Sequence, residues 1–159
     1  MNKLIIGLLT LCAFTACAQK HKANTEILAS MNTISSNLVL LNNQQSIVPL
    51  KTLEKLNIAS VSLSFSYATA FDSLLNKYAK VTPFSSNSYQ SSTTLNDLED
   101  DLKYFNTIIV AIPATASNDA RNLNFITSLA KSKQVIIALF GDSRSLVSFD
   151  AIQAPIVWT

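Results

Sequence analysis

The stretch TIIVAIPATASNDARNLNFITSLAKSKQVIIALFG, residues 107–141, decides the fold that this sequence predicts. It begins with a continuously apolar run at 107–112 and ends with a second apolar run at 134–140. A strand that is apolar along its whole length is typical of a parallel sheet covered by helices on both faces. Between the two runs, residues 118–130 have helical periodicity, with these residues facing inward: Leu123, Ile126, Leu129 and Ala130. The stretch therefore predicts a strand–helix–strand unit.

The same alternation continues on both sides of this unit. The sequence further predicts strands at 57–63, 80–84 and 155–158, helices at 69–78 and 95–105, and a helical turn at 146–149. Alternation of this kind implies a parallel sheet with right-handed crossovers. The predicted fold class is therefore α/β, a three-layer doubly wound sandwich with a mostly parallel sheet of about five strands.

Apolar periodicity also predicts the buried face of each upstream helix. The helix at 69–78 is expected to bury Phe71, Leu74, Leu75 and Tyr78. The helix at 95–105, with Thr94 as its N-cap, is expected to bury Leu95, Leu98, Leu102 and Phe105. The acidic residues of this second helix alternate with its buried stripe and are therefore expected to be solvated: Asp97, Glu99, Asp100 and Asp101.

An N-terminal amphipathic helix is expected to precede the fold, starting at Asn24 or Thr25. Its apolar residues recur at spacings of four and three: Ile27, Met31, Ile34, Leu38 and Leu41. The polar stretch 42–46 ends this helix. Residues 47–50 are expected to form an edge or docking strand, because Pro49 has no N–H to donate to a central ladder.

The composition of the 159-residue chain excludes several classes of protein. Hydrophobic residues make up 48% and charged residues 14%, which suits a folded domain with a sizeable core and argues against disorder. The formal net charge is +2, the basic residues are scattered, and no aromatic residues interleave with them. We therefore expect no nucleic-acid partner.

Residues needed for the commonest catalytic and cofactor sites are scarce. The single histidine, His21, lies near the N-terminus, so neither a Ser-His-Asp or Cys-His arrangement nor a multi-histidine metal site is predicted. The two cysteines, Cys12 and Cys17, also lie near the N-terminus. Gly141 is the sole glycine after Gly7, so glycine-rich phosphate loops are missing. We expect no cofactor and no metal.

The first residues have the pattern of an export signal. A short basic start at residues 1–3 precedes an apolar run at 4–14, which is too short to span a bilayer because that needs about 20 residues. Two interpretations remain open. Residues 16–18 (Ala-Cys-Ala) form an A-x-A cleavage site, whereas residues 14–17 (Phe-Thr-Ala-Cys) resemble a bacterial lipobox. We favour the second, with Cys17 as the lipidated residue.

These patterns divide the chain into three parts. Residues 1–17 are the signal peptide with its lipobox, 18–23 are a tether, and 24–159 are the folded domain. The chain is expected to be exported, to the periplasm or as an outer-membrane lipoprotein of a bacterium. Contact with the membrane would run through a lipid anchor if Cys17 is modified.

Asp142 is the best-placed candidate for a ligand contact. It follows Gly141 at the carboxyl end of a central strand, beside Ser143 and Arg144, where open α/β sheets bind ligands. Gly141 is expected to adopt φ > 0 in this turn. The alternative is that Asp142 is a turn or N-cap aspartate, and the sequence favours this over a ligand contact. No catalytic residue is predicted.

Taken in order, these segments resemble the C-terminal α/β domain of family 3 glycoside hydrolases, of the bacterial β-N-acetylglucosaminidase and β-glucosidase type. The resemblance rests on these segments: SNLVLLNNQQSIVPL (36–50), KLNIASVSLS (55–64), YFNTIIVAI (104–112), Arg121, KQVIIALFGDSRSLVSF (133–149) and PIVWT (155–159). It covers residues 24–159, and whether this domain is truncated at its C-terminal end stays open. Asp142, Ser143 and Arg144 stand where the family has Asn-Pro-Tyr.

The resemblance implies a domain without the catalytic part of such an enzyme. In the family, a TIM barrel precedes this domain and carries the aspartate nucleophile. In the N-acetylglucosaminidase branch, the acid/base residue also lies on a barrel loop. Here the signal leads almost directly into the segment at 36–50, so no catalytic residue is carried over.

Three hypotheses follow. The first is an accessory or remnant domain that is not catalytic alone. The second is a fragment or subunit of a working β-N-acetylglucosaminidase or β-glucosidase, whose partner is a glycosidase barrel or a downstream hydrolase domain; the end of the chain on a strand at Trp158-Thr159 favours it. The third is a periplasmic binding module for a small polar ligand or glycan, formed by strand ends at 64–67, 114–115 and 142–144. Tyr67 and Trp158 are aromatic residues that can stack on a sugar, although packing is the commoner role.

Overall fold

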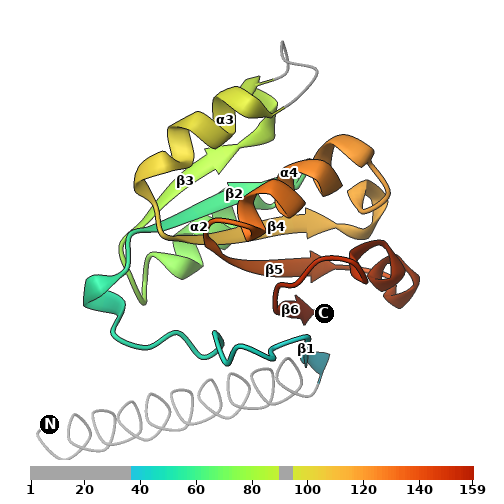
Figure 1. The fold of residues 1–159 in the computed structure, drawn as a ribbon, viewed down its shortest axis with the longest axis horizontal. Coiled ribbons are helices and arrows are strands. Elements are labelled where there is room, and N and C mark those ends of the chain that lie inside the picture. Colours follow the sequence, from blue (N-terminus) through green and yellow to red (C-terminus); the bar gives the residue numbers. More distant parts are fainter. Residues whose placement is uncertain (1–36, 90–94) are drawn as a thin grey trace, which may run out of the picture. The chain divides into compact units, whose positions relative to one another are not determined.

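A six-stranded sheet in the order β1-β6-β5-β4-β2-β3 organises the fold (Figure 1). The computed structural model describes residues 37–89 and 95–159, of which Val39–Thr159 form one unit. The strands are β1 (Val39–Leu41), β2 (Ile58–Ser62), β3 (Val81–Ser85), β4 (Thr107–Pro113), β5 (Gln134–Phe140) and β6 (Ile156–Trp158). β1 pairs antiparallel with β6, and the other pairings of these strands are parallel. The expected mostly parallel sheet is confirmed.

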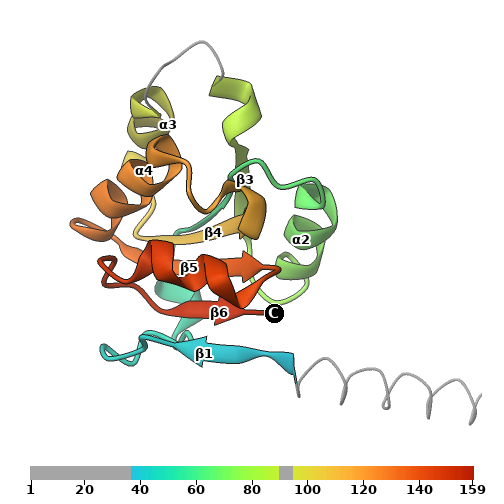
Figure 2. The same cartoon turned by 90° about the vertical axis from the view of Figure 1, so that its right-hand side faces the viewer.

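Helices cover both faces of the sheet. α2 (Ala68–Leu75) lies on one face, and α3 (Asn96–Asp101) and α4 (Ala120–Ala130) lie on the other (Figure 2). The described 3-10 helices are η1 (Leu53–Lys55), η2 (Ser86–Tyr89), η3 (Leu102–Tyr104), η4 (Ala114–Ala116) and η5 (Ser143–Phe149). This is the three-layer α/β sandwich that the sequence predicts.

The strand order reverses between β2 and β4. The chain runs from β2 outward to β3, crosses back over β2 to β4, and continues through β5 to β6. In open parallel sheets such a reversal leaves a crevice at the carboxyl ends of the two strands, where ligands bind. β3 is left at one edge of the sheet and contains Pro83, which an edge strand tolerates because its N–H side can face away from the ladder.

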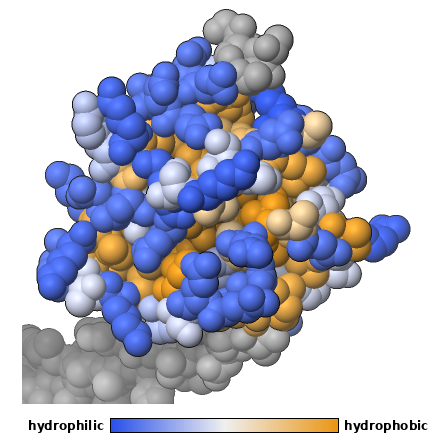
Figure 3. Space-filling view, viewed as in Figure 1, coloured by the Kyte–Doolittle hydropathy of each residue, from blue (hydrophilic) through white to orange (hydrophobic). Residues whose placement is uncertain are grey.

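Two apolar clusters hold the layers together. The larger lies between the sheet and the α3–α4 face, and residues from strand and helix such as Val110, Ile126 and Leu98 are fully buried in it. The smaller is centred on Ile58, Val81 and Ile109 beneath α2. Neighbouring residues of one strand reach both clusters because strand side chains alternate between faces. Seen from the α3–α4 side, hydrophilic residues lie over much of the surface, with hydrophobic residues showing between them (Figure 3).

The sequence-based prediction is wrong at the N-terminal edge of the sheet. Leu41 was expected on a helix, but it belongs to β1 and pairs with Ile156 of β6. Residues 47–50 were expected as a strand and form none. The physical reason is the Asn43 side chain, which accepts from Val48 N (3.1 Å) and donates to Val48 O (2.6 Å), the two groups that a ladder would use.

The helix expected at 69–78 is shorter than predicted. α2 ends at Leu75, and Asn76 then donates its side-chain amide to Asp72 O (3.0 Å) and accepts from Val81 N (3.0 Å). Tyr78 therefore lies beyond the helix and is 81% exposed rather than buried, and Leu74 is exposed as well. The other two apolar residues of the stripe, Phe71 and Leu75, pack against the smaller cluster as expected.

The other expected elements agree closely with the structure. The helix expected at 95–105 is α3 followed by η3, and its leucines are buried as predicted: Leu95, Leu98 and Leu102. Phe125 of α4 is also buried, which the sequence analysis did not predict. The expected N-cap Thr94, the expected helix at 24–41 up to residue 36, His21 and Cys17 lie outside the described residues. None of the helices in 37–89 and 95–159 is long and apolar enough to cross a membrane.

Candidate functional site

The carboxyl ends of β2, β4 and β5 meet at one edge of the sheet, where the topology favours a site. The three predicted strand-end segments, 64–67, 114–115 and 142–144, follow these strands directly. Phe65 stacks on Phe140 with ring centroids 4.5 Å apart, so the ends of β2 and β5 are in contact. The structure therefore brings together at this edge the segments that the sequence analysis selected.

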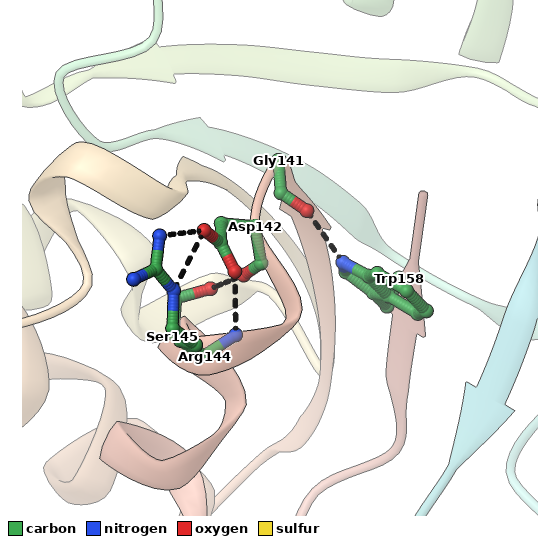
Figure 4. A network of polar contacts seen from close by, with 5 residues as sticks. All are labelled: Gly141, Asp142, Arg144, Ser145 and Trp158. Carbon is green, nitrogen blue, oxygen red and sulfur yellow. Dashed lines mark hydrogen bonds and ion pairs between the residues drawn. The ribbon is translucent and has the colours of Figure 1, made fainter.

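Both the backbone conformation at position 141 and the close approach of Ala114 require glycine there. Its φ is 120°, which confirms the expected positive φ, and a Cβ at this position would lie 3.0 Å from Ala114 Cβ. Gly141 N donates to Thr159 O (2.9 Å), and Trp158 Nε1 donates to Gly141 O (2.7 Å; Figure 4). The half-buried Trp158 indole thus holds the end of β5 against the end of β6, and this edge bond uses its one polar atom.

Asp142 is the N-cap of η5. Its carboxylate accepts from Arg144 N (2.9 Å) and from Arg144 Nε (2.9 Å), and the two side chains form an ion pair (Figure 4). These hydrogen bonds from Arg144 lower the pKa of Asp142 from 3.8 to about 2. The carboxylate is therefore ionised at neutral pH and satisfied within its own turn, which is the geometry of a capping aspartate.

Among the described residues, Ser143 and Arg144 make no contact that indicates a ligand. The Arg144 side chain is 90% exposed, and the guanidinium is occupied by Asp142. Ser143 is exposed at the start of η5. The next serine, Ser145, is buried and donates its hydroxyl to Asp142 O, which closes the turn (Figure 4). Asp142, Ser143 and Arg144 thus lie together as predicted, but their side chains bind one another and their own backbone.

An aromatic cluster of Phe65, Tyr67, Phe71 and Phe140 lies at the same edge and was not predicted from the sequence. Phe71 is edge-on to Phe140 at 5.8 Å and to Phe65 at 6.1 Å, and Tyr67 is edge-on to Phe65 at 6.1 Å. Tyr67 is 73% exposed, so the cluster reaches the surface. The available signal was that Phe140 ends a buried strand and Phe65 follows another, because parallel strands end at the same edge.

A hollow of about 440 Å³ lies beside the ends of β2 and β3. Among its described lining residues, Asp72 alone is acidic, and it accepts from Ser60 Oγ at 2.6 Å. A glycosidase needs two carboxyl groups facing each other across a sugar, and the described lining of this hollow supplies one. In residues 37–89 and 95–159, no group of three or more His, Cys, Asp or Glu side chains is arranged to hold a metal ion.

Comparisons with known proteins give one informative likeness. No family model matches the sequence, and no curated protein matches it. A solved structure superposes with a TM-score of 0.60 at 12% sequence identity, over 77% of this chain and 14% of that chain. It is described as a fungal multi-domain GH3 β-N-acetylglucosaminidase in which a unique GCN5-related glucosamine N-acetyltransferase region exists. At this identity the likeness shows the α/β fold alone, and the chain spans about a seventh of the structure it matches.

Proposed function

We propose that this chain is an accessory domain of the kind found in family 3 glycoside hydrolases and is not catalytic alone. The observation that carries the proposal is the fold likeness to part of a multi-domain GH3 enzyme. The segments that resemble the family in sequence, 55–64, 104–112 and 133–149, supply β2, β4 and β5 of that fold. The sequence resemblance and the fold likeness both support the same family context.

The side chains at the carboxyl ends of β2, β4 and β5 support a role other than catalysis. Asp142, the carboxylate nearest the end of β5, is bound by Arg144 and held ionised by it, so it is a poor proton donor at neutral pH. Asp72, beside the end of β2, is bonded to Ser60. Asp142, held ionised by Arg144, is therefore poorly suited to act as the general acid on a glycosidic bond.

The proposed partner is a glycosidase barrel, encoded in a separate chain or in the same gene. A second candidate function is that of a subunit required by a working β-N-acetylglucosaminidase or β-glucosidase. The fungal structure favours it, because there a region with this fold is part of a GH3 enzyme chain. The two candidates differ in whether the barrel needs this chain for activity.

Two assays test the proposal. The purified chain is incubated with a chromogenic N-acetylglucosaminide and a chromogenic glucoside, and separately with glucosamine and acetyl-CoA, because the fungal enzyme contains an acetyltransferase region. We expect no turnover above a heat-unfolded sample of the same chain. Sustained turnover of any of these substrates by the chain alone would overturn the accessory role.

A barrel encoded beside this gene distinguishes the two candidates. It is purified with and without this chain, and its hydrolysis of the N-acetylglucosaminide is compared. A barrel that is inactive alone and active with the chain identifies a subunit. A barrel that binds the chain with its activity little changed identifies an accessory domain, and a barrel that does not bind it contradicts both.

We also propose that Cys17 anchors the exported chain to a bacterial membrane. The support is the lipobox pattern at residues 14–17. Cells labelled with a fatty acid analogue should yield a labelled chain in the membrane fraction, and Cys17→Ser should abolish the label. Labelling that persists in this variant, or wild-type chain found unlabelled in the soluble fraction, would contradict the anchor.

A further inference from the structure

A pocket of about 380 Å³ lies between α3 and α4, on the helical layer rather than at the strand ends. Its volume is within the range of small-molecule sites, roughly 300–1000 Å³. Leu95 and Phe125 give it an apolar, buried base. Its polar lining includes one cation and one anion, Arg121 from α4 and Glu99 from α3.

Arg121 has a position that the fold alone does not explain. It is the second residue of α4, in the first turn, where the helix dipole disfavours a positive side chain. The only ion pair among residues 37–89 and 95–159 is Arg144–Asp142, so Arg121 has no carboxylate partner there. Its Nη2 donates to Tyr89 O at 2.8 Å, which uses one of five guanidinium N–H donors.

The Nε of Arg121 is buried and has no acceptor among the described residues. Buried donors without a partner are rare in folded proteins, and each one calls for an explanation such as a bound ion or ligand. This atom has almost no accessible surface, so a ligand in the pocket would bind the other guanidinium donors of Arg121, and an anionic group there would suit the positive end of α4. Two separate features of Arg121, its place in the first turn of α4 and its lack of a carboxylate partner among the described residues, favour a negative ligand group in the pocket.

Glu99 makes the pocket unsuitable for a simple anion. It was expected to be solvated with the other acidic residues of its helix, but it is half-buried and accepts from Ser128 Oγ at 2.8 Å. That bond leaves acceptor capacity on the carboxylate. The side-chain amides of Asn96 and Asn124 complete the polar lining. A ligand that satisfies this pocket needs a negative group for Arg121 and a positive, donating group for Glu99.

We propose that this pocket binds a small zwitterion of the α-amino-acid or short-peptide class, with its carboxylate on Arg121 and its ammonium on Glu99. Arg binds carboxylates well because its planar N–H donors match the two oxygens. The apolar base formed by Leu95 and Phe125 accommodates a side chain of the ligand. This inference is independent of the proposed function, and its failure leaves that function untouched.

A purely structural role for Arg121 makes different predictions. Through Tyr89 O it ties α4 to η2, and the Tyr89 hydroxyl donates to Asp101 Oδ2 at 2.6 Å. The hydrogen bond to Asp101 raises the pKa of Tyr89 to about 12, so this tyrosine stays a neutral donor. If Arg121 served only this tie, its replacement would lower stability, and no zwitterion would bind.

Titration of the full chain with matched probes tests the inference. The probes are L-alanine, alanyl-alanine, N-acetylalanine without the ammonium, alaninamide without the carboxylate, and inorganic phosphate. Binding is followed by NMR chemical shifts of α3 and α4 and by the rise in Tm that a ligand of the folded state produces. We expect saturable binding of alanine or alanyl-alanine, and binding at least about tenfold weaker for each blocked probe and for phosphate, a factor of ten being about 1.4 kcal/mol.

Four variants locate the site. Arg121→Lys keeps a cation that can reach Tyr89 O but lacks the planar fork, so we expect at least about tenfold weaker binding with the fold retained. Arg121→Gln and Glu99→Gln should weaken binding as much or more. Arg144→Gln is the matched control, because Arg144 is 90% exposed and lies on η5, and its Kd should be that of the wild type.

Three results would overturn the inference. The first is that neither alanine nor alanyl-alanine shows saturable binding. The second is that phosphate and N-acetylalanine bind as tightly as the zwitterions, which would mean an adventitious ion only. The third is that the Arg121 and Glu99 variants lower Tm while the Kd stays unchanged. If Arg121→Gln fails to fold, Arg121→Lys and Glu99→Gln still decide the question.

Discussion

At the scale of single residues, the turn after β5 requires glycine at position 141 for two reasons. Its positive φ strains any L side chain, and the space that a Cβ needs is occupied by Ala114 Cβ at 3.0 Å. The glycine requirement could be predicted from the sequence because a lone glycine follows a buried strand. The steric part could not, because Ala114 is far away along the chain and approaches only in the fold.

Replacing Gly141 by Ala is expected to lower the free energy of unfolding by about 1–3 kcal/mol, from backbone strain together with the crowded Cβ. The measurement is urea unfolding followed by circular dichroism. In the double variant Gly141→Ala with Ala114→Gly, the crowding is relieved and the backbone strain remains. We therefore expect partial recovery, and equal loss in both variants would show that the Ala114 contact is irrelevant.

Asp142 makes stability depend on pH at the acidic end. Because its pKa falls from 3.8 to about 2 on folding, the folded state holds the ionised form more strongly. Its contribution is therefore fully present above pH 3.8 and is lost as the pH falls through about 2. Asp142→Asn removes the titration, so the stability difference from the wild type should be constant near neutral pH and shrink between these two values. A difference that stays constant throughout would contradict the Arg144 pairing.

Elements were predictable where their pattern had one interpretation and unpredictable where it had two. β4 and β5 are apolar after their first residues, Thr107 and Gln134, and fit only a buried strand at their length. The run 38–41 fits a helix stripe as well as a strand, and the choice is made by β6, which offers β1 a partner 115 or more residues along the chain. Asn43 likewise prevents residues 47–50 from forming a strand. It does so through side-chain hydrogen bonds to Val48, which strand propensity does not include.

Asn42 fastens the β1 end of the sheet to the loop before β6. It has a φ of 52°, and its side-chain amide donates to Ile152 O (2.9 Å) and Ala154 O (3.1 Å). Asn42→Ala loses both bonds and keeps the strained φ, so a loss of about 1–3 kcal/mol is expected. Asn42→Gly loses the bonds without the strain and should cost less. Urea unfolding and hydrogen exchange of β1 and β6 amides measure both, and an equal cost for the two would assign the whole effect to the bonds.

At the scale of the whole folded unit, Val39–Thr159, the described residues form two apolar clusters of unequal size on opposite faces of one sheet. The fold class was predictable because helix and strand periods alternate along the chain. At the candidate site, the capping role of Asp142 is the one that the sequence favours, whereas the aromatic cluster was not predictable because it joins residues 65 and 140. The pocket between α3 and α4 was not predicted either. Glu99 lies on the same helix as three exposed acidic residues, and it was expected to be solvated like them.

The unequal clusters predict unequal sensitivity to truncation. Leu98 is fully buried in the larger cluster, so Leu98→Ala should cost about 2–5 kcal/mol. Leu75 is only partly buried against the smaller cluster, and Leu75→Ala should cost clearly less. Calorimetry should show a single transition for each variant, because both clusters share the strands of one sheet. Two separate transitions would mean that the faces unfold independently.

The edges of the sheet also bear on how the protein behaves at high concentration. Unpaired strand edges are templates on which further chains can add, the usual start of fibre growth. At one edge of this sheet β3 carries Pro83, which lacks the amide proton that an incoming strand would need to find there. At the opposite edge β1 offers only three residues. Strand addition is therefore hindered at the β3 edge by Pro83, and at the β1 edge an added strand finds only three residues to pair with.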